Sequence, residues 1–312
     1  MNGERQEPID TGYLRRYAFS LGMSAPFVQP HLGEIVIASD RPAEAIVNIA
    51  RCFTAARRAA QPMAEYPGHI PADMATGYAV QEAAIGLWTD RIVGWKVGLV
   101  PPALQASLGI AHLAGPIFLE NLVRITGTDA VRLSAIPGGF AAIEGELIIS
   151  ALEDAPPDKV QWTLQEAAAF SGDWFFGVEF AASPLATIND LGPTVVVSDF
   201  GNNSGLVLGP RIDRALIAEP TQLTCRTQID GKEVGFASVT ALPGGPLASL
   251  RFLLGHVASR GRPLRAGQLV STGAITGVHR IFPGQRGETE FIGHWKIDLL
   301  AERATAQVRS GG

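Results

Sequence analysis

The pattern of hydrophobic and polar positions divides the chain into a tail, a helical part and a strand-rich part. Residues 1–40 show little periodicity and scattered Pro and Gly, so we expect a tail that is flexible or packed on a partner subunit. Within residues 41–90, apolar residues recur at spacings of three and four, which predicts two helices. The inner side of the second helix is expected to carry Met74, Tyr78, Gln81, Ile85 and Trp88.

After Asp90 the pattern changes to short apolar runs broken by Gly and Pro, which is typical of strands. Two further helices are expected within this part, over residues 163–170 and 248–260. Because strands and helices do not alternate regularly, we predict an α+β fold, with a β-rich domain over residues 91–312. Strands are expected over residues 92–99, 130–133, 143–150, 174–180, 194–198, 206–208, 222–229, 268–272, 288–291 and 295–299.

Three glutamates stand inside two of these apolar strand segments. Glu144 and Glu146 lie in AAIEGELIIS, and Glu179 lies in WFFGVEFAAS. Residues i and i+2 of a strand point to the same face, so Glu179 could complete a three-oxygen site from a neighbouring strand. A buried, unpaired charge is costly, so a cation is expected to receive these carboxylates. Carboxylate oxygens suit Mg²⁺ or Mn²⁺ better than they suit zinc or copper. The alternative is that the glutamates lie on the solvated face of a half-exposed sheet.

Lys96, in GWKVGLV, is a second charge in apolar surroundings. Its ammonium group either extends to solvent or is buried. Burial near a cation would lower its pKa and make it a general acid or base near neutral pH. The alternative is a lysine at the end of an edge strand.

Four polar residues in Gly-punctuated segments are candidates for substrate binding. Asp199 and Asn203 lie in SDFGNNSGLVLG, and Thr272 and Thr276 lie in STGAITG. Asp, Asn and Gly are also the residues that dominate turns, and hydroxyls can cap turns, so a purely structural role is the alternative for each.

The overall composition limits the function classes. The net charge is −5, which disfavours a general nucleic-acid or anionic-membrane surface, and Arg260, Arg262 and Arg265 lie in a connection typical of a solvated turn. Hydrophobic residues make up 46% and charged residues 18%, so part of the apolar surface is expected to be covered in a homo-oligomer. Neither a membrane span nor a secretory signal is recognised, and Cys52 and Cys225 form no redox motif, so we expect a cytoplasmic protein.

Several common site motifs are absent from the sequence. It contains no GxGxxG, no P-loop and no GxSxG, so dinucleotide, nucleotide triphosphate and α/β-hydrolase functions lack their usual signatures. The histidines show no HxH or HExxH spacing and are interpreted as surface or core residues; they are His31, His69, His112, His256, His279 and His294.

Taken in order, short stretches of this chain resemble the hydratase/decarboxylase branch of the fumarylacetoacetate hydrolase superfamily. This branch includes 2-keto-4-pentenoate hydratase and 4-oxalocrotonate decarboxylase. Each stretch is short, but together they follow the family order over residues 42–300. The stretches are 77–81 (GYAVQ), 94–99 (GWKVGL), 115–118 (GPIF), 143–146 (IEGE), 178–179 (VE), 198–209, 246–249 (PLAS) and 264–277.

The resemblance implies a mixed β-roll domain of the fumarylacetoacetase C-terminal type, with a small helical N-terminal part, that assembles into oligomers. It also implies that Glu144, Glu146 and Glu179 bind Mg²⁺ or Mn²⁺ and that Lys96 moves a proton. In this family the metal chelates the carboxylate and the neighbouring oxygen of a 2-oxo acid and stabilises the enolate. The implied activity is hydration of a short 2-hydroxydienoate in the breakdown of aromatic compounds.

The chain departs from the family pattern at several positions beside the expected site. Hydratases often carry an acidic residue just before Gly115, whereas here Ala114 ends the loop 112–114. The Asp and Arg that commonly follow the third metal ligand are replaced around Ala182 and Ser183. Ala274 stands where a residue with a hydroxyl is expected. These departures leave open a decarboxylase of an unsaturated 2-oxo diacid and a non-catalytic partner subunit. Hydrolysis of an acylpyruvate is less favoured because no matching His–Glu pair is found.

Overall fold

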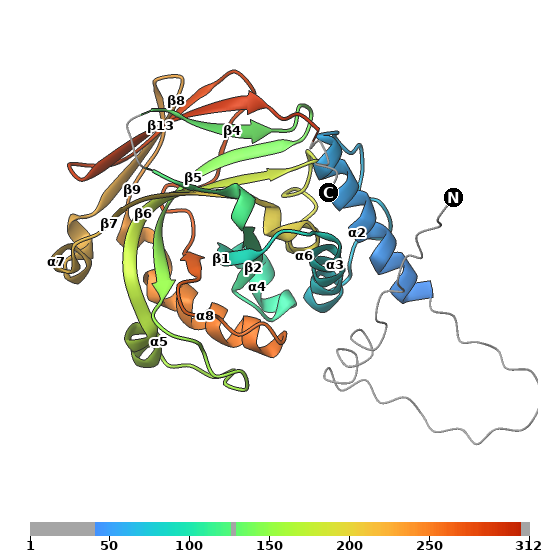
Figure 1. Ribbon diagram of the computed structural model, residues 1–312, viewed down its shortest axis with the longest axis horizontal. Coiled ribbons are helices and arrows are strands. Elements are labelled where there is room, and N and C mark those ends of the chain that lie inside the picture. The colour runs from blue at the N-terminus through green and yellow to red at the C-terminus, as the bar shows by residue number, and fades with distance from the viewer. Residues whose placement is uncertain (1–40, 126–128, 307–312) are drawn as a thin grey trace, which may run out of the picture. The chain divides into compact units, whose positions relative to one another are not determined.

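The computed structural model describes residues 41–125 and 129–306 (Figure 1). The expected tail, residues 1–40, lies outside the described residues. The chain divides into two compact units, Met1–Ala45 and Ile46–Gly312. Apart from the first residues of α2 (Arg41–Ala59), every described element belongs to the second unit. The boundary expected at residue 90 stays a prediction.

The larger sheet of the second unit holds the strands that carry the charged residues. Within the described part of the chain its order is β2-β1-β10-β5-β6-β7-β3, with β11 beside β5. All pairs along this order are antiparallel except β1 with β10 and β3 with β7, so the sheet is mixed. Its strands are β1 (Ile92–Leu99), β2 (His112–Phe118), β3 (Leu122–Arg124), β5 (Phe140–Ala151), β6 (Ser171–Ser183), β7 (Asn203–Arg211), β10 (Leu269–Ser271) and β11 (His279–Arg280).

A second sheet packs against the first through β5. Its order over the described residues is β4-β13-β12-β8-β9. A Cβ atom on Gly145 of β5 would lie 2.6 Å from Cys225 Sγ and 3.0 Å from Thr289 Cγ2, so only glycine allows this approach. Gly145 therefore faces the second sheet, and Glu144 and Glu146, its neighbours on β5, face away from that sheet. The strands are β4 (Val131–Ala135), β8 (Thr224–Ile229), β9 (Lys232–Ser238), β12 (Arg286–Phe291) and β13 (Trp295–Arg303).

The helices α6 (Pro193–Ser198) and α8 (Gly245–Ser259) contact the larger sheet, α3 (Met74–Leu87) packs on α6, and α5 (Leu164–Phe170) packs on α8 (Figure 1). Side-chain caps begin three helices of the described chain: Asp73 accepts from the Thr76 N–H at the start of α3, Thr163 forms a capping box with Glu166 at the start of α5, and Asp213 accepts from the Ala215 N–H at the start of α7 (Arg214–Ala218). None of the described helices is long and apolar enough to cross a membrane. Also described are α4 (Pro102–Leu108) and the 3₁₀ turns η1 (Leu119–Asn121), η2 (Phe200–Asn202), η3 (Pro220–Gln222) and η4 (Val239–Ala241).

The expected α+β fold and most of the expected elements are confirmed, but two local predictions are wrong. Residues 194–198 were expected to form a strand as one of the short apolar runs, and although its three valines favour a strand, this segment forms the buried helix α6 instead. Pro193 occupies its first turn, and Gln81 donates a hydrogen bond to Val197 O, so tertiary contacts override the local β preference. The loop expected at residues 112–114 is part of β2, an edge strand, where Pro116 is tolerated.

Candidate functional site

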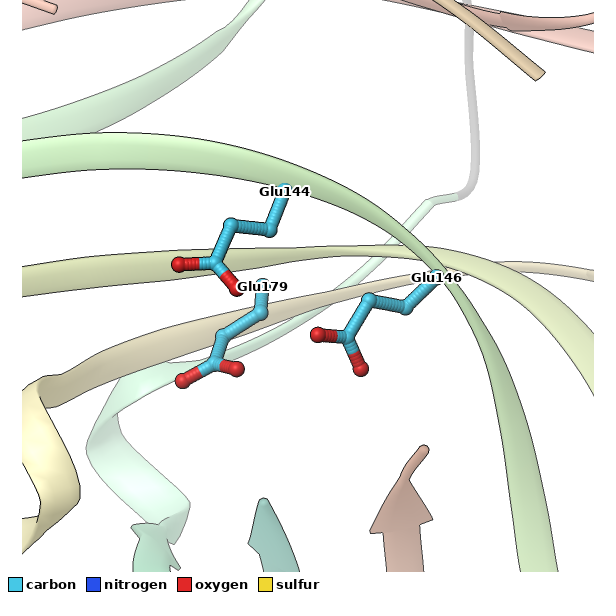
Figure 2. A group of neighbouring side chains, drawn as sticks. All are labelled: Glu144, Glu146 and Glu179. Atoms are coloured by element: carbon cyan, nitrogen blue, oxygen red, sulfur yellow. The ribbon is translucent and has the colours of Figure 1, made fainter. Parts of the chain in front are cut away.

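The three glutamates meet on one face of the larger sheet. Glu144 and Glu146 project from β5, and Glu179 stands directly opposite Glu144 on β6. One carboxylate oxygen from each lies within 4.8 Å of the others, and Figure 2 shows the three carboxylates directed into a common space. Their exposed fractions are 4%, 0% and 0%, so the alternative of a solvated sheet face does not hold.

Without a bound cation, burial makes the ionised forms of Glu144 and Glu146 unfavourable. It raises the pKa of Glu144 to about 8; the charge of Glu179 adds to the rise and Lys96 opposes it. Burial, followed by the charges of Glu179 and Glu144, also raises the pKa of Glu146 well above its usual range. The hydrogen bonds that Glu146 accepts oppose this rise but do not cancel it.

Two of the glutamates have one oxygen held by donors and one without a partner. Ser271 Oγ and the Gly273 N–H donate to Glu146 Oε2 at 2.6 and 2.8 Å, and Asn203 Nδ2 donates to Glu179 Oε1 at 3.0 Å. Glu146 Oε1 and Glu179 Oε2 are buried without a hydrogen-bond partner among the described residues. Donors that orient one carboxylate oxygen and leave the other free are an arrangement that suits a hard divalent cation.

Lys96 lies beside this group on β1. It is 4% exposed, and its Nζ lies 3.5 Å from Glu179 Oε1. The edge-strand alternative does not hold, because β1 pairs with both β2 and β10. The expected lowering of the pKa assumed a neighbouring cation. Burial alone does lower the pKa of Lys96, but the charges of Glu179, Glu144 and Glu146 outweigh burial and raise it.

A cavity of about 630 Å³ adjoins this group; its lining includes Lys96, Glu144, Thr272 and Thr276, but neither Glu146 nor Glu179. The other predicted substrate residues lie elsewhere. Asn203 is buried and holds Glu179, as described above. Asp199 is not among the lining residues; both of its carboxylate oxygens bond to the Arg57 guanidinium, at 2.5 and 3.0 Å.

The two threonines are also engaged with the protein. Thr272 Oγ1 donates to Leu147 O at 2.8 Å, and Thr276 Oγ1 shares a hydrogen bond of 2.8 Å with Thr227 Oγ1. Their hydroxyls thus fix the loop after β10 against β5 and β8.

Sequence reasoning missed two polar residues of the site. Ser271 donates to Glu146 from the position directly before Thr272, and its parallel pairing with Lys96 places both residues at the same level of the sheet. The only sequence signal was its place in the hydroxyl-rich STGAITG segment. Asn202 lines the cavity, and its Nδ2 donates to Asn189 Oδ1 at 3.1 Å; in sequence it was indistinguishable from a turn residue.

Comparison with known proteins finds similarity to hydratases. No protein-family model matches the chain. It is 24% identical over 238 residues to 2-keto-4-pentenoate hydratase 2 of Dechloromonas aromatica, covering 73% of this chain and 86% of that protein. It is 26% identical over 209 residues to 2-keto-4-pentenoate hydratase of Paraburkholderia phymatum, covering 65% of this chain and 76% of that protein.

Among solved structures, the fold is similar to that of 4-oxalocrotonate decarboxylase from Pseudomonas putida G7, solved with magnesium and adipate. The TM-score is 0.69 at 21% identity, and the match covers 83% of this chain and 98% of that chain. The resemblance found in the sequence, to 2-keto-4-pentenoate hydratase and 4-oxalocrotonate decarboxylase, is therefore confirmed, and the chain shares the fold of the decarboxylase.

Proposed function

We propose that this chain is a divalent-metal-dependent lyase that adds water to a 2-hydroxydienoic acid, the activity for which its similar hydratases are named. The observation that carries the proposal is a buried group of three glutamates next to a buried lysine and a cavity, and among the described residues two of the glutamates have an unpartnered oxygen. The raised pKa values of Glu144 and Glu146 mark the cost of burying their charge, and a bound cation would offset that cost and favour the ionised carboxylates.

Glu144, Glu146 and Glu179 would hold the cation, which we propose to be Mg²⁺ or Mn²⁺, in keeping with their all-oxygen donor set. When bound, such an ion supplies Lewis-acid polarisation of the substrate oxygens. The donors from Ser271, Gly273 and Asn203 fix the orientation of the carboxylates before any ion binds.

Lys96 is the residue that we propose to move the proton. Its Nζ lies in the lining of the cavity and is held 3.5 Å from Glu179, so it is positioned beside the group that would receive the substrate. In the hydration of a 2-hydroxydienoate, the enol oxygen loses a proton, carbons 3 and 5 each gain a proton, and carbon 4 gains hydroxide. The substrate thus gains one water in total. An ammonium group that gives up and regains a proton serves these transfers.

Decarboxylation of an unsaturated 2-oxo acid is the second candidate. It is favoured by one observation: among the described lining residues, Glu144 is the only carboxylate, and no second acid is present to position a water molecule. A non-catalytic partner subunit is the third possibility left from the sequence. The intact charge group argues against it, because a subunit without catalysis has no need to keep buried carboxylates.

Mass spectrometry of the products tests the proposal directly. The full chain is incubated with Mg²⁺ or Mn²⁺ and 2-hydroxypenta-2,4-dienoate, and the loss of diene absorbance is followed. We expect a product heavier by one water, no reaction with excess chelator, and none with Lys96→Met. Release of carbon dioxide from an unsaturated 2-oxo diacid, without hydration, would favour the decarboxylase. Absence of both reactions in metal-loaded protein would contradict the enzyme proposal.

We further propose a cytoplasmic homo-oligomer. Large apolar side chains such as Leu152, Phe236 and Phe282 are 60%, 58% and 54% exposed in the single chain, which supports their burial between subunits. Sedimentation at micromolar concentration is expected to give a species larger than the 33.0 kDa chain; a monomer alone would contradict this assembly.

A further inference from the structure

In two of the segments that line the cavity beside the glutamate group, the type of residue differs between the buried end and the exposed end. Along β1 the lining runs from Lys96, which is 4% exposed, to Leu99, which is 44% exposed. Along the loop after β10 it runs from Thr272, 1% exposed, to Val278, 50% exposed. In both segments the polar residue lies at the buried end and a large apolar residue at the exposed end.

The outer part of the cavity offers little to a second charge. Among the described residues that line it, Lys96 is the only permanently cationic group, and it already faces Glu179. His112 also lines the cavity, but burial and the charge of Arg251 lower its pKa, which favours the neutral ring. The large apolar lining residues that are exposed or half-buried are Leu99, Leu242 and Val278. The exposed Asn189 also lines the cavity; it is a neutral amide, and its Oδ1 accepts a hydrogen bond from Asn202 Nδ2.

The cavity is also larger than a five-carbon acid requires. Such an acid has roughly eight non-hydrogen atoms, and at the ~30 Å³ that a water molecule takes in the liquid these fill at most about 240 Å³. The cavity measures about 630 Å³. More than half of it is left over, and the outer part is lined by large apolar and neutral polar residues, with no charged group among the described ones.

We infer that the substrate is an acid with a single carboxylate and a bulky apolar group, alkyl or aryl, at the end of the chain far from the 2-oxygen. The inference rests on the proposed function, because it places the 2-oxo acid end at the glutamates and Lys96. A second carboxylate at the far end would lose water without gaining a cationic partner there, whereas an apolar group gains by leaving water.

Leu242 is the residue that we expect to set this preference. Its Cδ2 would lie 3.4 Å from a Cβ atom on Gly273, the residue whose N–H holds Glu146. Leu242 thus borders the cavity directly beside the loop that shapes the glutamate group, while its own side chain takes no part in that group.

Binding of non-reacting 2-oxo acids to the Mg²⁺-loaded full chain tests the inference by calorimetry, without turnover. Pyruvate probes the acid end alone; 2-oxobutanoate, 2-oxohexanoate and 2-oxo-4-phenylbutanoate add apolar length; and 2-oxohexanedioate ends in a second carboxylate. We expect affinity to rise roughly threefold to fourfold for each added methylene. We expect 2-oxohexanedioate to bind at least about tenfold more weakly than 2-oxohexanoate.

Two variants sharpen the test. Leu242→Lys is expected to weaken 2-oxohexanoate and tighten 2-oxohexanedioate, so that the ratio of the two affinities reverses. The matched control is Leu164→Lys, at a leucine that is 47% exposed on α5 and does not line the cavity, and it should change none of the affinities. Leu242→Ala, which adds no charge, should reduce the gain from apolar length.

The outcomes separate this inference from the proposed function. If pyruvate binds but longer apolar chains bring no gain, or if the diacid binds as tightly as the monoacid, the inference is overturned and the proposed function stands. If no 2-oxo acid binds to the metal-loaded protein, both are overturned.

Discussion

Two buried charged regions of this protein differ in how their charges are balanced. In the first, Glu144, Glu146 and Glu179 face a single lysine, and two carboxylate oxygens have no partner among the described residues. In the second, Asp199 and Arg57 form a one-to-one pair: two bonds join guanidinium and carboxylate, and Ser183 Oγ donates a further one at 2.7 Å.

The difference indicates which region is built for a ligand. A buried ion pair with complete hydrogen bonding is self-sufficient, and removing one partner harms the fold. A group with surplus negative charge is instead held at a cost by the fold and is relieved by a cation. Burial alone therefore does not identify a site; burial with unbalanced charge does.

The largest effect is expected from Lys96→Met, which keeps the apolar stem and removes the charge. Turnover should fall by roughly 10²–10⁴-fold if the ammonium transfers the proton, while metal binding is retained. Steady-state kinetics and metal titration measure the two quantities. Lys159→Met, at a half-buried lysine that pairs with Glu166 and does not line the cavity, is the control and should leave turnover unchanged. Turnover near the wild-type rate in Lys96→Met would remove Lys96 from the mechanism.

Asp199→Asn is expected to lower the free energy of unfolding by about 3–5 kcal/mol, because it leaves the Arg57 charge buried without its partner. Chemical denaturation measures this change. The control is Asp173→Asn, which breaks the exposed pair with Arg211 and should cost less than about 1 kcal/mol. Equal effects of the two variants would mean that the Asp199 pair is no more structural than a surface pair.

Glu146→Gln should differ from Asp199→Asn in its effect on stability. In metal-free protein the raised pKa of Glu146 already favours its neutral form, which glutamine replaces without a change of charge, so the free energy of unfolding should not fall. Metal affinity, followed by titration with Mn²⁺, should weaken by about 100-fold or more, since loss of even an outer partner of a ligand costs about 10–100-fold. A destabilised variant with unchanged metal affinity would reverse the assignment of the two regions.

The sequence predicted the first region better than the second. Carboxylates at i and i+2 of an apolar strand indicate a shared face, and the structure places Glu144 and Glu146 on one. The direct pairing of Glu144 with Glu179 depends on strand register, which no local pattern specifies. Their roles as ligands stay predictions, as does the role of Lys96.

The balanced pairs were not predictable, because their partners are distant in the chain. Arg57 and Asp199 are 142 positions apart, and nothing around Asp199 distinguishes a buried acid from a turn residue. Arg260 was assigned to a solvated turn, and this is wrong: it is 3% exposed and paired with Glu82, which is 178 positions away. Local patterns report periodicity and turns, whereas such pairs are set by the packing of whole elements.

The surroundings of the Arg260–Glu82 pair allow a last and smaller test, at His256, which lies next to Arg260. The His256 ring packs against Tyr78 and stacks on Phe252, next to Arg260. Burial, with the charge of Arg260 added, lowers the pKa of His256 to about 3. The unfolded chain therefore takes up the proton first, and the stability that neutral His256 contributes is fully present above pH 6.5 and is lost as the pH falls towards 3.

His256→Phe keeps a stacking ring and removes this titration. Relative to the wild type, the variant should gain about 1–2 kcal/mol of unfolding free energy when the pH is lowered from 7.5 to 5. Denaturation at the two pH values measures the gain, and His69→Phe, at an exposed histidine, should show none. Because the carboxylates titrate in both proteins, their contribution cancels in the difference. If the wild type and the variant lose stability in parallel, acid does not destabilise this protein through His256.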